Sequence, residues 1–331
     1  MKNDPNDDDD LVWEIGSGET SNRRAPSVGT VQHVHGRSSL NARLLLITVG
    51  LVLVALLIYW AVSQWQIYNA QESIRELIRR EDAAAYARDV DGVRASLAGG
   101  DPAWEEWILQ QVRAGRASPL PDPELSAEPG EPETVFIFFN LEEAHVQVYR
   151  TFKDISGAPF RYRFDQRYQQ VDGEWKRVPI PDSYWGDRLS FFGSRLALRF
   201  SAADESLLTK DIGPEIERLL VRWCSSQPCA AETLPVRIGF VSDLAPVGLT
   251  EATPGDGQFL TPRLAGHPIG QVAVERFLRK LQVWSYRGVA ERTYLTDTGE
   301  PDAARIDLVG VCLGILPGSR DPQTCTAIGV R

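Results

Sequence analysis

The chain has 331 residues, of which 43% are hydrophobic and 24% are charged, and it carries a formal net charge of -10 with a pI near 5.1. These ordinary values exclude collagen-like, fully disordered and small disulfide-dense proteins. An acidic chain is also poorly suited to grip the phosphates of nucleic acid, so no nucleic-acid partner is expected.

Residues 1–43 form a polar tail in which an acidic block precedes an arginine block. Low hydrophobicity and a high content of Pro, Gly, Ser and Asn predict that this tail is disordered. One apolar cluster follows the run of four aspartates and is a candidate docking motif for a cytoplasmic partner. Its residues are Leu11, Val12, Trp13 and Ile15. The alternative is a solubilising tail with one isolated Trp.

The next segment is almost wholly apolar. The 19 residues from Leu44 to Val62 would span about 28 Å as a helix, close to the hydrocarbon thickness of a bilayer. A membrane-spanning helix is therefore expected over residues 44–65, with the lipid bilayer as its partner. The alternative is a buried helix of a soluble core. Four aromatic residues at the far end suit a headgroup interface: Tyr59, Trp60, Trp65 and Tyr68.

The helix is expected to be an uncleaved anchor, because 43 polar residues precede its full-length apolar core. Arg43 adjoins that core, whereas the far side carries no charge before Glu72. This asymmetry favours a cytoplasmic N-terminus and an extracytoplasmic C-terminal region.

The cysteines give independent information on the compartment. All four lie in the last third of the chain, and an even set on one side of a membrane suits an oxidising compartment. They are Cys224, Cys229, Cys312 and Cys325. Pairing of neighbours is expected, although the crossed pairings stay open. Zinc is disfavoured because the spacings are C-x4-C and C-x12-C with only His267 nearby, so no metal or cofactor is expected.

Residues 66–186 read as a first external α+β domain. A helical stripe continues from residue 67, a short helix is expected at 90–97, and Asp101-Pro102 caps a third helix. The pattern then alternates, which predicts strands at 135–140, at 144–152 and from 160 onward, with a hairpin turn at Asp172-Gly173.

These strands carry the ligand-pocket candidates His145, Tyr149, Arg161 and Arg163. His145 is not expected to be catalytic, because no acid lies two residues away on its strand face; a sheet residue facing solvent or a helix is the alternative. The arginines could bind an anion, or they could belong to a solvated sheet face. No catalytic residue is assigned.

Residues 187–331 read as a second small α+β domain with the order β-α-β-β-α-β. Its second helix is expected to begin near Pro268, and residues 305–316 are expected to form the last strand. The triplet Asp297-Thr298-Gly299 matches an aspartic-protease motif, but its neighbours favour a solvated turn.

Two resemblances add to these predictions. The run from Ile74 to Trp107, with the later segments DGEWKRVP and SYWG, resembles the NTF2-like (SnoaL-like) cone fold of membrane-anchored bacterial proteins, over residues 66–186. That fold implies helices across a curved sheet, in a family of small hydrolases, isomerases and non-catalytic binding modules. Residues 187–331 resemble the start of peptidase MA-like gluzincins without the H-E-x-x-H motif, which implies an inactive or truncated relative.

The leading expectation is a single-pass, membrane-anchored extracytoplasmic protein that binds a protein partner or a small ligand without catalysis. One alternative is a hydrolase that uses the cone pocket or descends from a gluzincin. Another is a transmembrane regulator that docks a cytoplasmic partner through its acidic tail.

Overall fold

The computed structural model describes residues 38–327, except residues 121–123, 129, 139, 228, 230–233 and 243–255. The chain divides into two units, Met1–Trp60 and Ala61–Arg331, and each is described by itself. The proposed docking residues Leu11, Val12, Trp13 and Ile15 lie outside the described residues.

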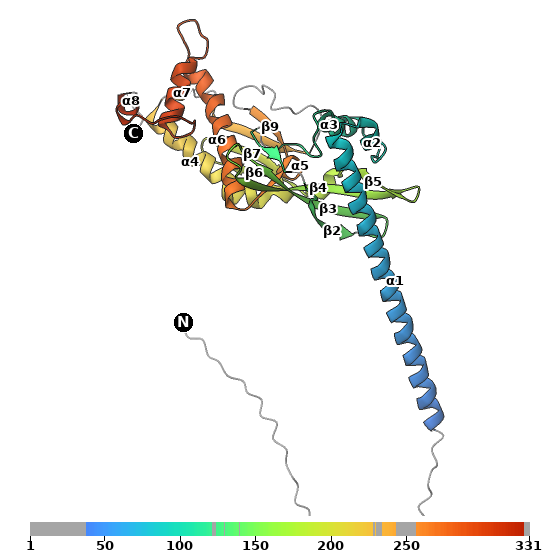
Figure 1. Ribbon diagram of the computed structural model, residues 1–331. Coiled ribbons are helices and arrows are strands. Elements are labelled where there is room, and N and C mark those ends of the chain that lie inside the picture. The colour runs from blue at the N-terminus through green and yellow to red at the C-terminus, as the bar shows by residue number, and fades with distance from the viewer. Residues whose placement is uncertain are drawn as a thin grey trace, which may run out of the picture. The chain divides into compact units, whose positions relative to one another are not determined.

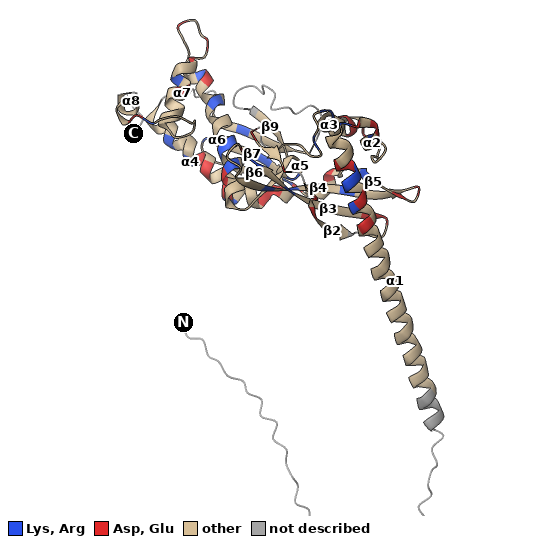
Figure 2. Cartoon of the chain, in the orientation of Figure 1, with Lys and Arg blue, Asp and Glu red and all other residues tan. Residues whose placement is uncertain are grey.

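The first long element is one continuous helix, α1 (Ser38–Tyr86). From Leu44 onward its large apolar side chains are exposed, and Leu46 for example is 68% exposed. Figure 2 shows this stretch without charged residues. In the described part of the chain α1 is the one helix long and apolar enough to cross a membrane, with a mean hydropathy of 2.7. The candidate single span predicted from the sequence is therefore present.

Farther along, α1 changes its environment. Ala70, Ile74, Leu77 and Ile78 recur at helical spacing and pack against Val146 and its neighbours in a sheet. Two shorter helices, α2 (Val90–Arg94) and α3 (Pro102–Arg113), follow. As predicted, Asp101 caps α3, because its carboxylate accepts hydrogen bonds from the backbone N–H groups of Ala103 at 3.0 Å and Trp104 at 3.2 Å.

Antiparallel strands form the first sheet (Figure 1). Its strands are β1 (Ser126–Ala127), β2 (Glu133–Phe138), β3 (Glu143–Lys153), β4 (Pro159–Val171), β5 (Glu174–Val178) and β10 (His267–Ile269). Asp172 and Gly173, with φ of 53° and 81°, make the predicted turn between β4 and β5. Alternate residues of β3, such as Ala144, Val146 and Val148, face the α1 stripe. The odd-numbered residues, including His145, therefore lie on the opposite face.

The second sheet has the order β6-β7-β8-β9. Its strands are β6 (Arg188–Phe192), β7 (Leu196–Ser201), β8 (Val236–Val241) and β9 (Asp256–Leu260). The pairs β7–β8 and β8–β9 are parallel. Its core includes residues of α4 (Gly213–Ser226) and α6 (Gln271–Thr293), with Trp223 and Tyr286 fully buried among them. The mixed α+β class is thus confirmed.

Short helices complete this part of the chain. They are the 3-10 helices η1 (Asp182–Trp185) and η2 (Ala202–Asp204), the π-helix η3 (Leu207–Ile212), and the α-helices α5 (Pro262–Ala265), α7 (Ala303–Cys312) and α8 (Pro322–Ala327).

One prediction about the last third is wrong. Residues 305–316 are not a strand, because most of them form α7. The carboxylate of Asp302 accepts a hydrogen bond from the backbone N–H of Arg305 at 3.1 Å, and Ile306, Val309 and Cys312 are buried at helical spacing. The helix expected near Pro268 is present and begins at Gln271. Pro268 belongs to β10 and pairs with β4.

Both neighbouring cysteine pairs form disulfides, as predicted. Cys224 bonds Cys229 and Cys312 bonds Cys325, each with 5.4 Å between the Cα atoms. The second bond joins α7 to α8. No cysteine remains free.

Candidate functional site

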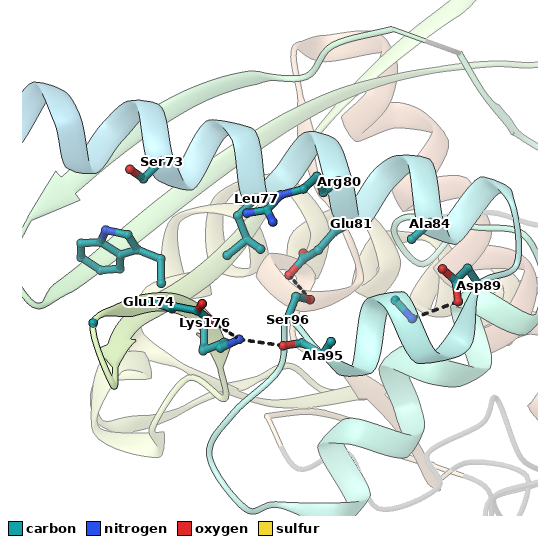
Figure 3. Close-up of a pocket in the computed structure, with 13 residues that line it drawn as sticks. Ser73, Leu77, Arg80, Glu81, Ala84, Asp89, Ala95, Ser96, Glu174 and Lys176 are labelled. Carbon is teal, nitrogen blue, oxygen red and sulfur yellow. Dashed lines mark hydrogen bonds and ion pairs between the residues drawn. The ribbon is translucent and has the colours of Figure 1, made fainter.

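A cleft of about 610 Å³ opens between α1, the segment around α2 and the β4–β5 hairpin (Figure 3). Its volume falls in the range of small-molecule sites. We call it the Glu81 cleft. It is lined by Ser73, Leu77, Arg80, Glu81, Ala84, Asp89, Gly92, Ala95, Ser96, Gly173, Glu174, Trp175 and Lys176.

Glu81 is the buried acid of this cleft, with 7% of its surface exposed. It lies one helical turn after Leu77 on the buried side of α1. Its Oε1 lies 2.7 Å from Ser96 Oγ, and its Oε2 lies 3.7 Å from Nη1 of Arg177. Burial raises the pKa of Glu81, and the charge of Arg177 and the Ser96 contact oppose that rise only in part.

Ser96 and Arg177 hold the carboxyl group of Glu81 in place. The Ser96 hydroxyl lies 2.7 Å from both Glu81 Oε1 and the carbonyl oxygen of Val93, so its single proton is shared between these two acceptors. Arg177, at 3.7 Å, forms an ion pair with the same carboxyl group.

The charged groups around the cleft differ in their pairing. Lys176 Nζ donates to the carbonyl of Ala95 at 2.9 Å and pairs with Glu174 at 2.9 Å. The carboxylate of Asp89 caps α2 by accepting from the N–H of Gly92 at 2.9 Å. Among the described residues Arg80 has neither a hydrogen bond nor an ion pair, and its side chain is exposed. The charge of Arg80 nevertheless acts on Glu174, because Lys176 and Arg80 together lower the pKa of that carboxyl group.

A second polar site lies on the face of the first sheet that α1 does not cover. We call it the inter-sheet cluster, because it joins residues of the first sheet to residues that follow strands of the second sheet. Its members are His145, Arg163, Asp165, Tyr184, Asp204, Thr261, Arg263 and His267.

His145 is almost wholly buried, with 1% of its surface exposed. Its ring stacks on Tyr184 of η1 with centroids 4.1 Å apart, so it faces neither solvent nor the α1 helix. Its Nε2 lies 3.8 Å from Asp165 Oδ1, and both ring nitrogens lack a hydrogen-bond partner among the described residues. The acid beside His145 comes from the neighbouring strand β4, a position that spacing along β3 cannot reveal.

Asp165 is the centre of the cluster. Nη1 of Arg263 lies 3.0 Å from its Oδ2, and Nε of Arg163 lies 3.6 Å from its Oδ1. Burial favours the neutral acid, but His145 and the two arginines outweigh it and lower the pKa of Asp165.

Two other members of the inter-sheet cluster have shifted pKa values. Burial raises the pKa of Asp204 to about 6, although Asp204 accepts a hydrogen bond from the Thr261 hydroxyl and lies near Arg263. Burial, with the charges of Arg163 and Arg263, lowers the pKa of His267 to about 4. Asp204 and Thr261 follow the carboxyl ends of the parallel strands β7 and β9, the edge at which α/β sheets gather polar groups.

The four predicted pocket residues therefore separate. His145 and Arg163 join the inter-sheet cluster. Tyr149 and Arg161 lie nearer the surface, where the Arg161 guanidinium is 4.8 Å from the Tyr149 ring centroid and pairs with Glu133. They line a different hollow of about 380 Å³. The sequence did not single out Glu81 as a site residue. An acid within an apolar helical stripe looks like a surface position until its tertiary partners are known.

The remaining motifs give no site. In the described part of the chain, no group of three or more His, Cys, Asp or Glu residues is arranged to hold a metal ion. Asp297 lies in an exposed turn that the Thr296 N–H closes by donating to the carbonyl of Glu300 at 2.7 Å.

In comparisons with known proteins, no family model matches the chain and no characterised protein matches its sequence. Function is therefore inferred from the apolar helix, the disulfides and the two polar sites.

Proposed function

We propose that the chain is a single-pass, membrane-anchored extracytoplasmic binding protein that does not catalyse a reaction. The exposed apolar part of α1 carries this proposal, because large apolar side chains such as Leu46 and Leu53 stay more than half exposed. The two disulfides support an oxidising compartment for the remainder of the chain. Arg43 before the apolar core supports a cytoplasmic N-terminus.

Residues 66–186 form an NTF2-like module in this proposal. The order of three helices before an antiparallel meander supports it, as does the packing of the α1 stripe across β3 and β4. Residues 187–331 form the second α+β region, with a likeness to gluzincins that extends only to element order. Its strand β10 pairs with β4, so the two regions share the first sheet.

The Glu81 cleft supplies the binding site in this proposal. Binding is favoured over hydrolysis because the cleft holds one buried acid, Glu81, with no histidine among its lining residues. His145, the other candidate acid-base group, is buried under Tyr184 and out of reach of a substrate.

Accessibility of engineered cysteines in intact cells tests the topology. Thr298→Cys lies in an exposed turn and is expected to react with a membrane-impermeant maleimide in intact cells. Ser17→Cys in the tail is the matched control and is expected to react only after permeabilisation. The reverse pattern would refute the orientation. Loss of a cytoplasmic partner on deletion of residues 1–43 would favour the transmembrane regulator instead.

A further inference from the structure

The second sheet has one face that its helices leave uncovered. The other face carries Leu198, Ile238 and their neighbours, which pack in one core with residues of α4 and α6. Because successive side chains of a strand point to opposite faces, the residues between them lie on the uncovered face, which we call the open face. In β6, β7 and β8 the exposed residues of the open face are Arg188, Ser190, Phe192, Arg199 and Arg237.

The open face is basic, although the chain as a whole has 45 acidic and 35 basic residues. Its strands carry three arginines, and Asp256 is the one acid at its register positions among the described residues. Asp256 lies opposite Arg237, so we count these two charges as offsetting each other. Arg188 and Arg199 have no hydrogen bond or ion pair within the described part of the chain. Their two charges are therefore the excess positive charge of the open face.

Both of these arginines lie close to the edge of the sheet. Arg199 is in register with Ser190 of β6 on one side and with Gly239 of β8 on the other. Because neither neighbour has a large side chain, the guanidinium of Arg199 can extend over β6 toward the edge. Arg188 lies on β6 itself, two residues before Ser190 and on the same face. A group that lies beside β6 can therefore reach both cations.

The outer edge of β6 has no strand beside it. β6 ends the strand order of the second sheet, and among the described residues its backbone pairs only with β7. Proteins usually block such an edge with proline or lysine, and β6 has neither. The strand instead ends at Phe192, whose side chain is 75% exposed. The edge can therefore accept a further strand, with an apolar contact at one end.

We propose that β6 binds an extended acidic segment of a partner protein, which adds a strand to the second sheet. Every second side chain of such a strand lies over the open face. Two acidic side chains at alternate positions pair with Arg188 and Arg199, and an apolar side chain at the next alternate position contacts Phe192. This surface is separate from the Glu81 cleft, and its test does not depend on whether that cleft binds a ligand.

Three peptides test the proposal on the full-length protein in nanodiscs of uncharged lipid. They are Val-Thr-Glu-Thr-Glu-Thr-Val and its versions with Gln or Lys in place of both Glu residues. The pattern is the same in both directions, so it fits β6 in parallel or antiparallel pairing. Fluorescence anisotropy of the labelled peptides is expected to show about tenfold tighter binding of the Glu peptide than of the Gln peptide, about threefold for each exposed ion pair. Equal or tighter binding of the Gln or Lys peptide, or saturable binding of none, would overturn the proposal.

Two double variants locate the charges that matter. Arg188→Gln with Arg199→Gln is expected to weaken the Glu peptide about tenfold and to leave the affinity of the Gln peptide unchanged. Arg222→Gln with Arg320→Gln is the matched control, because it removes two exposed arginines that lie outside the second sheet and have no ion pair among the described residues. The control is expected to keep wild-type affinity. Equal losses in both double variants would reveal a general charge effect and overturn the assignment to the open face.

Hydrogen exchange tests the added strand. Backbone amides of residues 188–192 are expected to exchange more slowly with saturating Glu peptide, because the new strand pairs with the outer edge of β6. Protection confined to another segment would overturn the pairing. A second copy of this chain is the competing occupant. Dimers of the full-length protein that the Arg188→Gln, Arg199→Gln variant dissociates, with no peptide bound, would overturn the acidic partner in favour of self-association.

Discussion

Asp204 and His267 are expected to give the folding stability two opposing pH dependences that nearly cancel in the wild type. The folded-state pKa of Asp204 is about 6, above its ordinary value of 3.8. The folded chain therefore holds a proton that the unfolded chain has released, and stability from Asp204 is present at low pH and lost as pH rises through about 6. The shift corresponds to about 3 kcal/mol.

His267 acts in the opposite direction. Its folded-state pKa is about 4, below its ordinary value of 6.5. The unfolded chain binds the proton first as the pH falls, so stability from His267 is present above about 6.5 and lost as pH falls through about 4. This contribution is also about 3 kcal/mol. Arg163, Arg263 and Asp165 act on both groups, so the two contributions are coupled.

Asp204→Asn and His267→Gln separate the two effects. Between about pH 4 and pH 6.5, the stability of Asp204→Asn relative to wild type is expected to rise by about 3 kcal/mol, and that of His267→Gln to fall by about 3 kcal/mol. Urea unfolding of the full-length protein in an uncharged detergent, followed by near-ultraviolet circular dichroism, measures both differences. A difference that stays flat with pH for either variant would refute the assigned shift for that residue.

Three further outcomes follow from other parts of the chain. Arg150→Met is expected to lower the free energy of unfolding in urea by about 3–5 kcal/mol. The reason is that Asp82 stays half-buried without the bidentate partner whose nitrogens lie 2.6 and 2.8 Å from its carboxylate. The double variant that also removes the Asp82 charge should recover part of that loss, and no recovery would contradict a specific pair. Replacing Cys312 and Cys325 together by Ser is expected to lower the free energy of unfolding by about 2–4 kcal/mol. The double replacement should also abolish the effect of reductant on melting of that region. Unchanged stability would argue against a structural disulfide. Leu53→Arg is expected to raise the free energy of membrane insertion by about 3 kcal/mol. Carbonate extraction measures this effect, and a larger fraction of the variant than of the wild type should be extracted. Equal extraction would count against a membrane span.

Features encoded by neighbouring residues were predictable from the sequence. The apolar run from Leu44 to Val62, the Asp101 cap and the Asp172-Gly173 turn depend on contacts within a few residues, so composition and spacing suffice. The disulfide partners are also close in sequence, which made the observed pairing the expected one.

The tertiary structure decided what depends on distant partners. Residues 305–316 carry apolar positions compatible with both strand and helix periods, and only packing of Ile306, Val309 and Cys312 in one core selects the helix. His267 to Ile269 become a strand because β4, about a hundred residues earlier, offers them hydrogen bonds. Burial likewise raises the pKa of Glu81, because the residues that bury it come from other elements. Sequence therefore determined the candidate membrane span and the local elements, while the polar sites arose from long-range packing that changes the solvation of each ionisable group.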